Sequence, residues 1–223
     1  MFAVTNRKDH DNSKILLPNW QIFILITIIN LLITFWVQKL IYSREFYYSL
    51  LSEQMEISRI DDLIEAMGRY SYLGFVLLPV FLFLRFLITS LLLQLILLLK
   101  FIEIKFNRLF RHVMLSSLVI FAGQVIHSIR LVYSLPAALN RDLLTIKPLS
   151  LAGLLDTGNY PQSSLMILNH CGLFEILWMC CIYYGLLRTN RLKKEEAAVI
   201  VLILWSGMLF LAWAFSFYIE KFQ

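Results

Sequence analysis

The stretch NHCGLFEILWMCCIYYG, residues 169–185, places one carboxylate, Glu175, in a run that otherwise has the composition of a membrane-spanning helix. An ionisable side chain inside a membrane span is costly, so it marks a function or a specific partner. An asparagine and a histidine precede Glu175, and two adjacent cysteines follow it. Which group the carboxylate contacts must be inferred from residues elsewhere in the sequence.

The chain as a whole has the composition of an integral membrane protein. Hydrophobic residues make up 59% of the 223 residues, charged residues 16%, and the mean hydropathy is +0.72, whereas soluble domains carry about 25% charged residues. A bilayer core of about 30 Å needs about 20 apolar residues of helix to cross it. Runs of this kind predict about five transmembrane helices, at residues 20–41, 70–99, 113–134, 163–187 and 197–219.

The second of these spans is the least regular. It is longer than one crossing needs, it contains Pro79, and Arg85 interrupts it. Two alternatives stay open, one long tilted helix that protrudes into the cytoplasm or a helix broken in two. We expect the whole chain, residues 1–223, to form a single all-α membrane domain, a polytopic helical bundle.

The Lys and Arg residues predict the orientation of the bundle. In a five-span arrangement eleven of them fall on the side of the N-terminus and seven on the other side, and cytoplasmic loops carry the excess. We therefore expect a multi-pass membrane protein, in the inner membrane if the source is bacterial, with a cytoplasmic N-terminus and an extracytoplasmic C-terminus. The first residues are charged and are followed by no small-residue cleavage site, so we expect the first span to remain as an anchor.

Two segments on the extracytoplasmic side are long enough to have structure of their own. Residues 44–69 have the pattern of an amphipathic helix whose apolar face includes Phe46, Leu50, Ile57, Ile60 and Ile64. Such a helix would lie on the membrane or over the bundle, or alternatively offer a docking surface for a partner. The loop at 135–162 contains SLAGLLD, residues 150–156, which predicts a short helix with Ser150 as its N-cap, lying on or dipping into the membrane.

No arrangement of reactive groups predicts catalysis. The sequence offers no converging set of metal ligands, and the three cysteines have neither the count nor the spacing of a disulfide frame or a zinc site. We interpret Cys171, Cys180 and Cys181 as small packing residues, and we expect no catalytic, cofactor-binding or metal site. The basic residues are not interleaved with aromatic ones as the binding of single-stranded nucleic acid would require, and we expect no nucleic-acid partner.

Glu175 needs a cation or a proton if it lies inside the membrane. Arg85 is the basic residue nearest the middle of a predicted span, and Arg130 lies nearer the end of another. We predict an intramembrane ion pair between Arg85 and Glu175 that joins the second predicted span to the fourth. Arg130 or a separate subunit is the alternative partner, and Asn169, His127 and Arg130 are secondary polar candidates.

The last third of the chain carries a pattern of a loop followed by two apolar helices. A Ser-Leu-x-x-Leu-Leu loop precedes a helix with an asparagine, an aromatic step and a terminal Gly-Leu, and then a turn with Lys193 and Lys194. Over residues 150–205 this pattern resembles the Yip1-like (YIP1 domain) family of five-span membrane proteins; the first 110 residues do not align with it. The matching positions are Ser150, Leu151, Leu154, Leu155, Asn169, Phe174, Trp178, Gly185, Leu186 and Ala197.

The resemblance implies a scaffold of the kind that acts in membrane trafficking, and it supplies no catalytic residue. We therefore expect a non-enzymatic membrane scaffold or an accessory subunit of an export or transport complex. Its partners would be the lipid bilayer and another membrane protein or further copies of the chain. The alternative is a small transporter or channel subunit in which Arg85, Glu175, Asn169 and His127 line a polar path. An intramembrane enzyme is a distant third interpretation.

Overall fold

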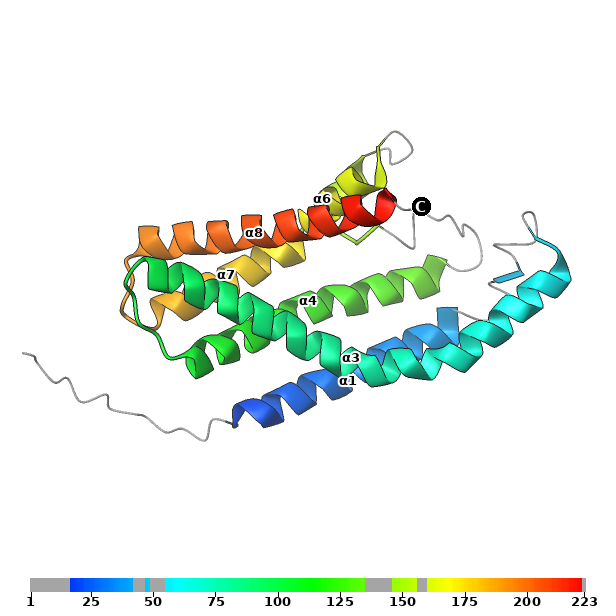
Figure 1. The fold of residues 1–223 in the computed structure, drawn as a ribbon, viewed down its shortest axis with the longest axis horizontal. Coiled ribbons are helices and arrows are strands. Elements are labelled where there is room, and N and C mark those ends of the chain that lie inside the picture. The colour runs from blue at the N-terminus through cyan, green and yellow to red at the C-terminus, as the bar shows by residue number, and fades with distance from the viewer. Residues whose placement is uncertain (1–16, 42–46, 49–54, 135–145, 156–159, 222–223) are drawn as a thin grey trace, which may run out of the picture.

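The computed structural model describes residues 17–41, 47–48, 55–134, 146–155 and 160–221 (Figure 1). Four helices of this part are long and apolar enough to cross a membrane, and a fifth, α7, is a shorter apolar helix. The described part is thus an all-helical, multi-pass membrane bundle, as the composition predicts. Its elements are α1 (Asn19–Ile41), α3 (Ile57–Leu99), α4 (Phe106–Ser134), the 3-10 turn η1 (Leu151–Leu154), α6 (Gln162–His170), α7 (Leu173–Leu187) and α8 (Lys194–Glu220).

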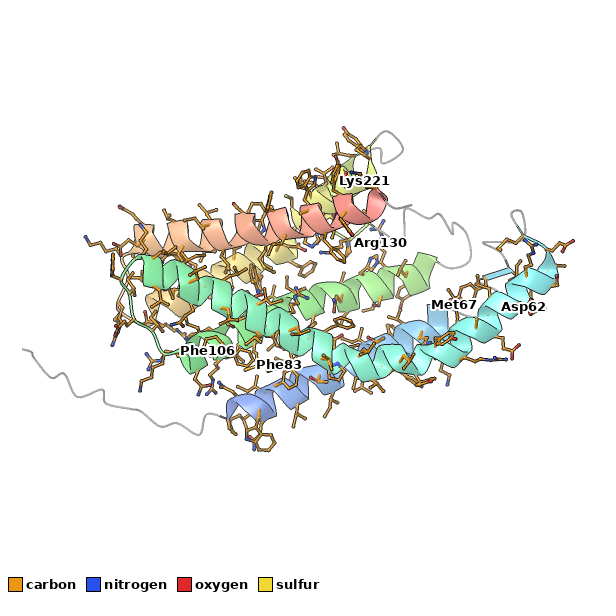
Figure 2. All side chains as sticks on the ribbon, in the orientation of Figure 1. Asp62, Met67, Phe83, Phe106, Arg130 and Lys221 are labelled. Carbon is orange, nitrogen blue, oxygen red and sulfur yellow. The ribbon has the colours of Figure 1, made fainter. Side chains whose placement is uncertain are left out.

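The outer surface of the bundle is apolar, as a surrounding of lipid requires. Large hydrophobic side chains stand exposed along α1, α3 and α8, for example Leu32, Phe81 and Phe210. Figure 2 shows side chains of this kind projecting outward along the helices. In water such a surface would be an aggregation hazard, whereas in a bilayer it is the expected contact with acyl chains.

α3 is one continuous helix of 43 residues. At a rise of about 1.5 Å per residue it is roughly 65 Å long, about twice the thickness of a bilayer core. Pro79 lies inside it, and Figure 1 shows α3 changing direction along its length, which is the usual effect of a proline within a helix. The open question about residues 70–99 is therefore answered: they belong to one long, bent helix.

The predicted amphipathic helix at 44–69 is corrected by this continuity. From Ile57 onward the segment is the first part of α3, and Phe46 and Leu50 lie outside the described residues. The expected buried face is only partly buried, since Ile60 is fully buried but Ile57 is 68% exposed. Nothing between the two segments stops a helix, because Gly68 alone costs only about 1 kcal/mol.

Aromatic side chains hold α1, α3 and α4 together. The ring of Phe23 on α1 meets the rings of Phe83 and Phe86 on α3 edge to face, with centroids 5.9 and 6.4 Å apart. Phe83 in turn meets Phe110 on α4 at 6.1 Å. Each such pair adds about 0.5–1.5 kcal/mol beyond its buried area, so this cluster fixes how the three helices cross.

Two glycines allow α7 to approach α4 closely. A Cβ at Gly123 of α4 would lie 2.7 Å from the ring of Phe174, and a Cβ at Gly185 of α7 would lie 3.2 Å from the ring of His112. Between these points α7 buries Trp178 and Ile182 against the core. α7 therefore packs directly on α4, which in turn contacts α1 and α3, although α7 is among the shorter helices.

The two ends of the bundle differ in charge. One end, which we call the basic end, consists of the start of α1, the loop at 100–105 and the loop at 188–193 (Figure 1). There the Arg191 guanidinium donates to the backbone carbonyl of Glu103 at 2.6 Å, and the side-chain amide of Asn19 donates to the backbone carbonyl of Asn107 at 3.1 Å. The basic side chains at this end are Lys100, Lys105, Arg108, Arg111, Arg188, Arg191, Lys193 and Lys194.

Candidate functional site

The predicted span at 163–187 is not one helix but two. α6 ends at His170 and α7 begins at Leu173, with Cys171 and Gly172 between them in non-helical conformations. At about 1.5 Å per residue the two pieces measure roughly 13 and 22 Å, which together match one crossing of a bilayer core. The expectation of a single continuous helix is thus corrected to a broken one, with Glu175 in the first turn after the break.

A second segment satisfies the backbone at the break. The Leu151 amide donates to the Cys171 carbonyl at 3.1 Å, and the Leu173 amide donates to the Leu149 carbonyl at 3.1 Å, which forms an isolated antiparallel bridge between Ser150 and Gly172. Irregular backbone at membrane depth is tolerated only where protein or a polar cavity supplies such partners. Residues 146–155, which we call the inserted segment, must therefore reach the same depth as the break.

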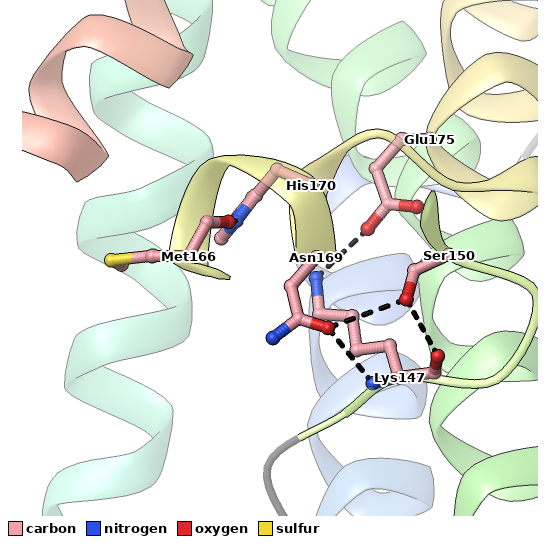
Figure 3. A network of polar contacts seen from close by, with 6 residues as sticks. All are labelled: Lys147, Ser150, Met166, Asn169, His170 and Glu175. Atoms are coloured by element: carbon pink, nitrogen blue, oxygen red, sulfur yellow. Dashed lines mark hydrogen bonds and ion pairs between the residues drawn. The ribbon is translucent and has the colours of Figure 1, made fainter. Parts of the chain in front are cut away.

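Asn169 ties the inserted segment to α6 (Figure 3). Its Oδ1 accepts a hydrogen bond from the Lys147 amide at 3.0 Å and lies 3.3 Å from the Ser150 hydroxyl. That hydroxyl lies closer to the Lys147 carbonyl, at 2.7 Å. Ser150 does stand at the N-cap position of η1, but its side chain makes no capping bond, so the expected N-cap role is corrected to closing the turn at Lys147.

Glu175 forms an ion pair with Lys147, and Figure 3 shows the two side chains reaching toward each other. Lys147 Nζ lies 2.8 Å from Glu175 Oε1, and the side chains are 42% and 10% exposed respectively. A carboxylate in the first turn of a helix is also stabilised by the helix dipole. Gly172 leaves the necessary room, because a Cβ there would lie 2.7 Å from Glu175 Oε2.

The predicted ion pair between Arg85 and Glu175 is therefore corrected. Lys147 holds the carboxylate, and the Arg85 side chain makes no hydrogen bond or ion pair with any residue in the described ranges. The physical reason is the break, which turns the first turn of α7 toward the inserted segment. Arg85 nevertheless lies close by, because it lines the same cavity as Glu175.

That cavity, of about 600 Å³, lies between α3, α4, α7 and α8, with the inserted segment at its wall. It is the place where most of the predicted polar residues meet, since Arg85, His127 and Glu175 all line it. Asn169 is not in the lining and instead holds the wall in place. The polar lining consists of Arg85, Thr89, Ser117, Gln124, His127, Lys147, His170 and Glu175, and the aromatic lining of Phe86, Phe174, Trp178 and Trp205.

Arg130 and the cysteines lie outside this cavity. Arg130 is exposed on the last part of α4 (Figure 2). Cys180 and Cys181 are exposed on α7, and Cys171 is half-buried at the break. The interpretation of all three cysteines as packing residues is thus wrong for the adjacent pair, which belongs to the outer surface. Within the described ranges no cluster of three His, Cys, Asp or Glu could hold a metal ion.

Sequence reasoning missed Lys147, Ser117 and Gln124. Ser117, Gln124 and His127 are separated by seven and three residues, so they share one face of a helix, and this spacing could have identified the polar wall of α4. Lys147 gave no such signal, because only the tertiary structure brings its loop to the break. Comparisons of the chain with protein-family models, with curated proteins and with solved structures found no match.

Proposed function

We propose that the protein is a small membrane transporter or transport subunit that binds an anion in its intramembrane cavity. The observation that carries the proposal is the Arg85 side chain, which lines the cavity and makes no hydrogen bond or ion pair with a described residue. A charged group at membrane depth is costly unless something compensates it. A ligand with a negative charge would supply the compensation.

The charges of the cavity wall support this assignment. Two cations, Arg85 and Lys147, stand against one carboxylate, Glu175, and that carboxylate is already paired with Lys147. Counting the histidines as neutral, the wall has one positive charge in excess. Arg85 is exposed to this cavity and not packed in the core, and an arginine within a membrane bundle is costly without a compensating charge, so a bound anion explains it better than packing does.

The position of the cavity supports transport in particular. Arg85 lies roughly 20 Å from the end of α3 at Leu99, and Glu175 a similar distance from the end of α7, at a rise of about 1.5 Å per residue. If these two helix ends mark one face of the bilayer, both groups would lie near its middle. Binding at the midplane beside a discontinuous helix is a recurring arrangement in secondary transporters.

A scaffold or accessory subunit, as in the Yip1-like resemblance, is the second candidate. It is favoured by the first part of α3, which extends beyond the other helices (Figure 1) and exposes Met67, Tyr70 and Tyr72. A partner could dock there. A scaffold, however, gives no role to an arginine that lines the cavity without an ion pair among the described residues, so we rank the scaffold below the transporter.

Charge movement in proteoliposomes tests the proposal. We expect concentration jumps of a small panel of anions, namely acetate, benzoate and phosphate, to produce protein-dependent currents on a solid-supported membrane. Arg85→Gln should abolish the current, whereas the matched control Arg130→Gln, which removes an arginine from outside the cavity, should retain it. Currents that are absent from the unmodified protein, or equal in both variants, would contradict anion transport.

A further inference from the structure

We propose that the ligand of the cavity is a singly charged oxyanion on an apolar body, with Arg85 binding the acid group. The inference rests on the proposed function for its choice of cavity, but it concerns binding and not movement across the membrane. The polar and the apolar parts of the cavity wall each indicate one part of the ligand. A dissolved organic acid and a fatty acid from the bilayer share this chemistry, and the experiment below separates them.

The polar half directs the acid group to Arg85. Lys147 is already neutralised by Glu175 at 2.8 Å, and that carboxylate would repel an anion placed beside the pair. The hydroxyl of Thr89 is engaged with the Arg85 carbonyl at 2.8 Å. Arg85 is left as the cation with free donors, and its planar fork matches an oxyanion bidentately.

His170 does not compete for the anion. Its Nδ1 lies 2.8 Å from the Met166 carbonyl, and because a carbonyl only accepts, that nitrogen must carry the hydrogen. In the neutral ring Nε2 is then an acceptor without a hydrogen. His170 therefore offers no donor to an oxyanion, which strengthens the assignment to Arg85.

The apolar half requires a body on the ligand. Trp178, Trp205, Met208 and Leu209 line the wall contributed by α7 and α8. A cavity of about 600 Å³ corresponds to the volume of roughly twenty water molecules and lies within the range of small-molecule sites. An inorganic anion would leave most of this space as water against tryptophan and leucine, whereas an aromatic or aliphatic body would fill it.

Two tryptophans in the wall provide the readout. The full chain is placed in phosphatidylcholine nanodiscs with Trp20, Trp36 and Trp213 replaced by Phe, so that Trp178 and Trp205 are the emitters. Two quenchers represent the two sources: 4-nitrobenzoate, with the neutral 4-nitrobenzamide as its control, and 9,10-dibromostearate, with its neutral methyl ester as control.

We expect saturable quenching by an acid probe and much weaker quenching by its neutral control. Loss of a charge-assisted pair should weaken binding on the order of tenfold to a hundredfold in Arg85→Gln, and Arg130→Gln should bind as the unmodified protein does. Arg85→Lys keeps the charge without the fork, so it should bind more weakly than Arg but better than Gln. If Arg85→Gln does not fold, Arg85→Lys carries the test with a loss of affinity expected.

The outcomes separate the ligand from the transport proposal. Quenching by nitrobenzoate alone identifies a dissolved acid, quenching by dibromostearate alone identifies a lipid, and both support the shared chemistry. Equal affinity for acid and neutral probes, or unchanged affinity in the folded Arg85 variants, would overturn the assignment. If the acid probes bind selectively but no anion produces a current, the transport proposal is wrong and the ligand assignment stands. If phosphate produces a current but neither acid probe binds, the ligand assignment is wrong and the transport proposal stands.

Discussion

The polar residues around Glu175 contact one another, so that the position of each side chain depends on its neighbours. Lys147 neutralises the carboxylate, Asn169 holds the Lys147 amide, and Gly172 leaves space for the carboxylate itself. Sequence reasoning correctly predicted that Glu175 needs a cation. It chose Arg85 because it considered cations inside predicted spans, and the break that brings Lys147 to the carboxylate has no signature in hydropathy.

Gly172→Ala tests the space around the carboxylate. The added Cβ would meet Glu175 Oε2 at 2.7 Å and the Leu149 carbonyl at 3.3 Å, so either the ion pair or the backbone bridge must shift. We expect a loss of about 1–3 kcal/mol of stability, as for other overpacked sites, seen as a lower melting temperature in detergent. Gly207→Ala on α8, where nothing lies within 4 Å, is the matched control and should be neutral or slightly stabilising. Equal effects of the two changes would show that the break tolerates a side chain.

The Lys147 to Glu175 pair is tested by a double-mutant cycle. Lys147→Met and Glu175→Gln should each lower the melting temperature, and the double variant should lose less than the sum of the two. The side chain of Lys147 is 42% exposed, so the coupling should fall below the 3–5 kcal/mol of a fully buried pair, at about 1–2 kcal/mol. A parallel cycle with Arg85→Gln and Glu175→Gln should give a smaller coupling energy than the cycle with Lys147→Met and Glu175→Gln. If the Arg85 cycle gave the larger coupling, Arg85 and not Lys147 would be the partner of the carboxylate.

At the scale of elements, hydropathy located the helices but not the break. The spans predicted at 20–41, 113–134 and 197–219 lie within α1, α4 and α8, and the span at 70–99 is the second part of α3. Residues 165–187 form an apolar run that only Asn169, His170 and Glu175 interrupt with polar side chains, and a lone glycine seldom ends a helix. What ends α6 is the backbone bridge to Leu149 and Leu151, which lie far away in the sequence.

Leu173→Pro tests whether the bridge holds the break. Proline is well tolerated as the first residue of a helix, where its missing N–H breaks no intrahelical bond, so at Leu173 it should remove the bond to the Leu149 carbonyl and leave α7 intact. We expect faster amide hydrogen exchange over residues 146–155 and a loss of about 1 kcal/mol or more. Lys194→Pro, at the first residue of α8, is the control and should leave that exchange unchanged. Unchanged exchange in Leu173→Pro would mean that other contacts hold the inserted segment.

At the scale of the whole molecule, the number of crossings decides which solvent the cavity can reach. If α6 and α7 together make one crossing, the basic end and the residues from Tyr160 to the start of α6 lie on opposite sides of the membrane. The excess of Lys and Arg at the basic end then predicts that this end lies in the cytoplasm. Lys147 and the inserted segment would enter the membrane from the other side, so the cavity would be built from an external segment and four helices.

Cysteine labelling determines this topology. In a background without Cys171, Cys180 and Cys181, single cysteines are introduced at the exposed positions Phe101, Asn190, Tyr160 and Lys221. We expect an impermeant maleimide added to intact cells to label Tyr160→Cys and Lys221→Cys, and to label Phe101→Cys and Asn190→Cys only after permeabilisation. The reverse labelling pattern would place the basic end outside the cell, opposite to the orientation that its Lys and Arg residues predict. Protection of Tyr160→Cys together with Asn190→Cys would make α6 and α7 a hairpin that enters and leaves on the cytoplasmic side, and the inserted segment that pairs with them would then have to enter from that side as well.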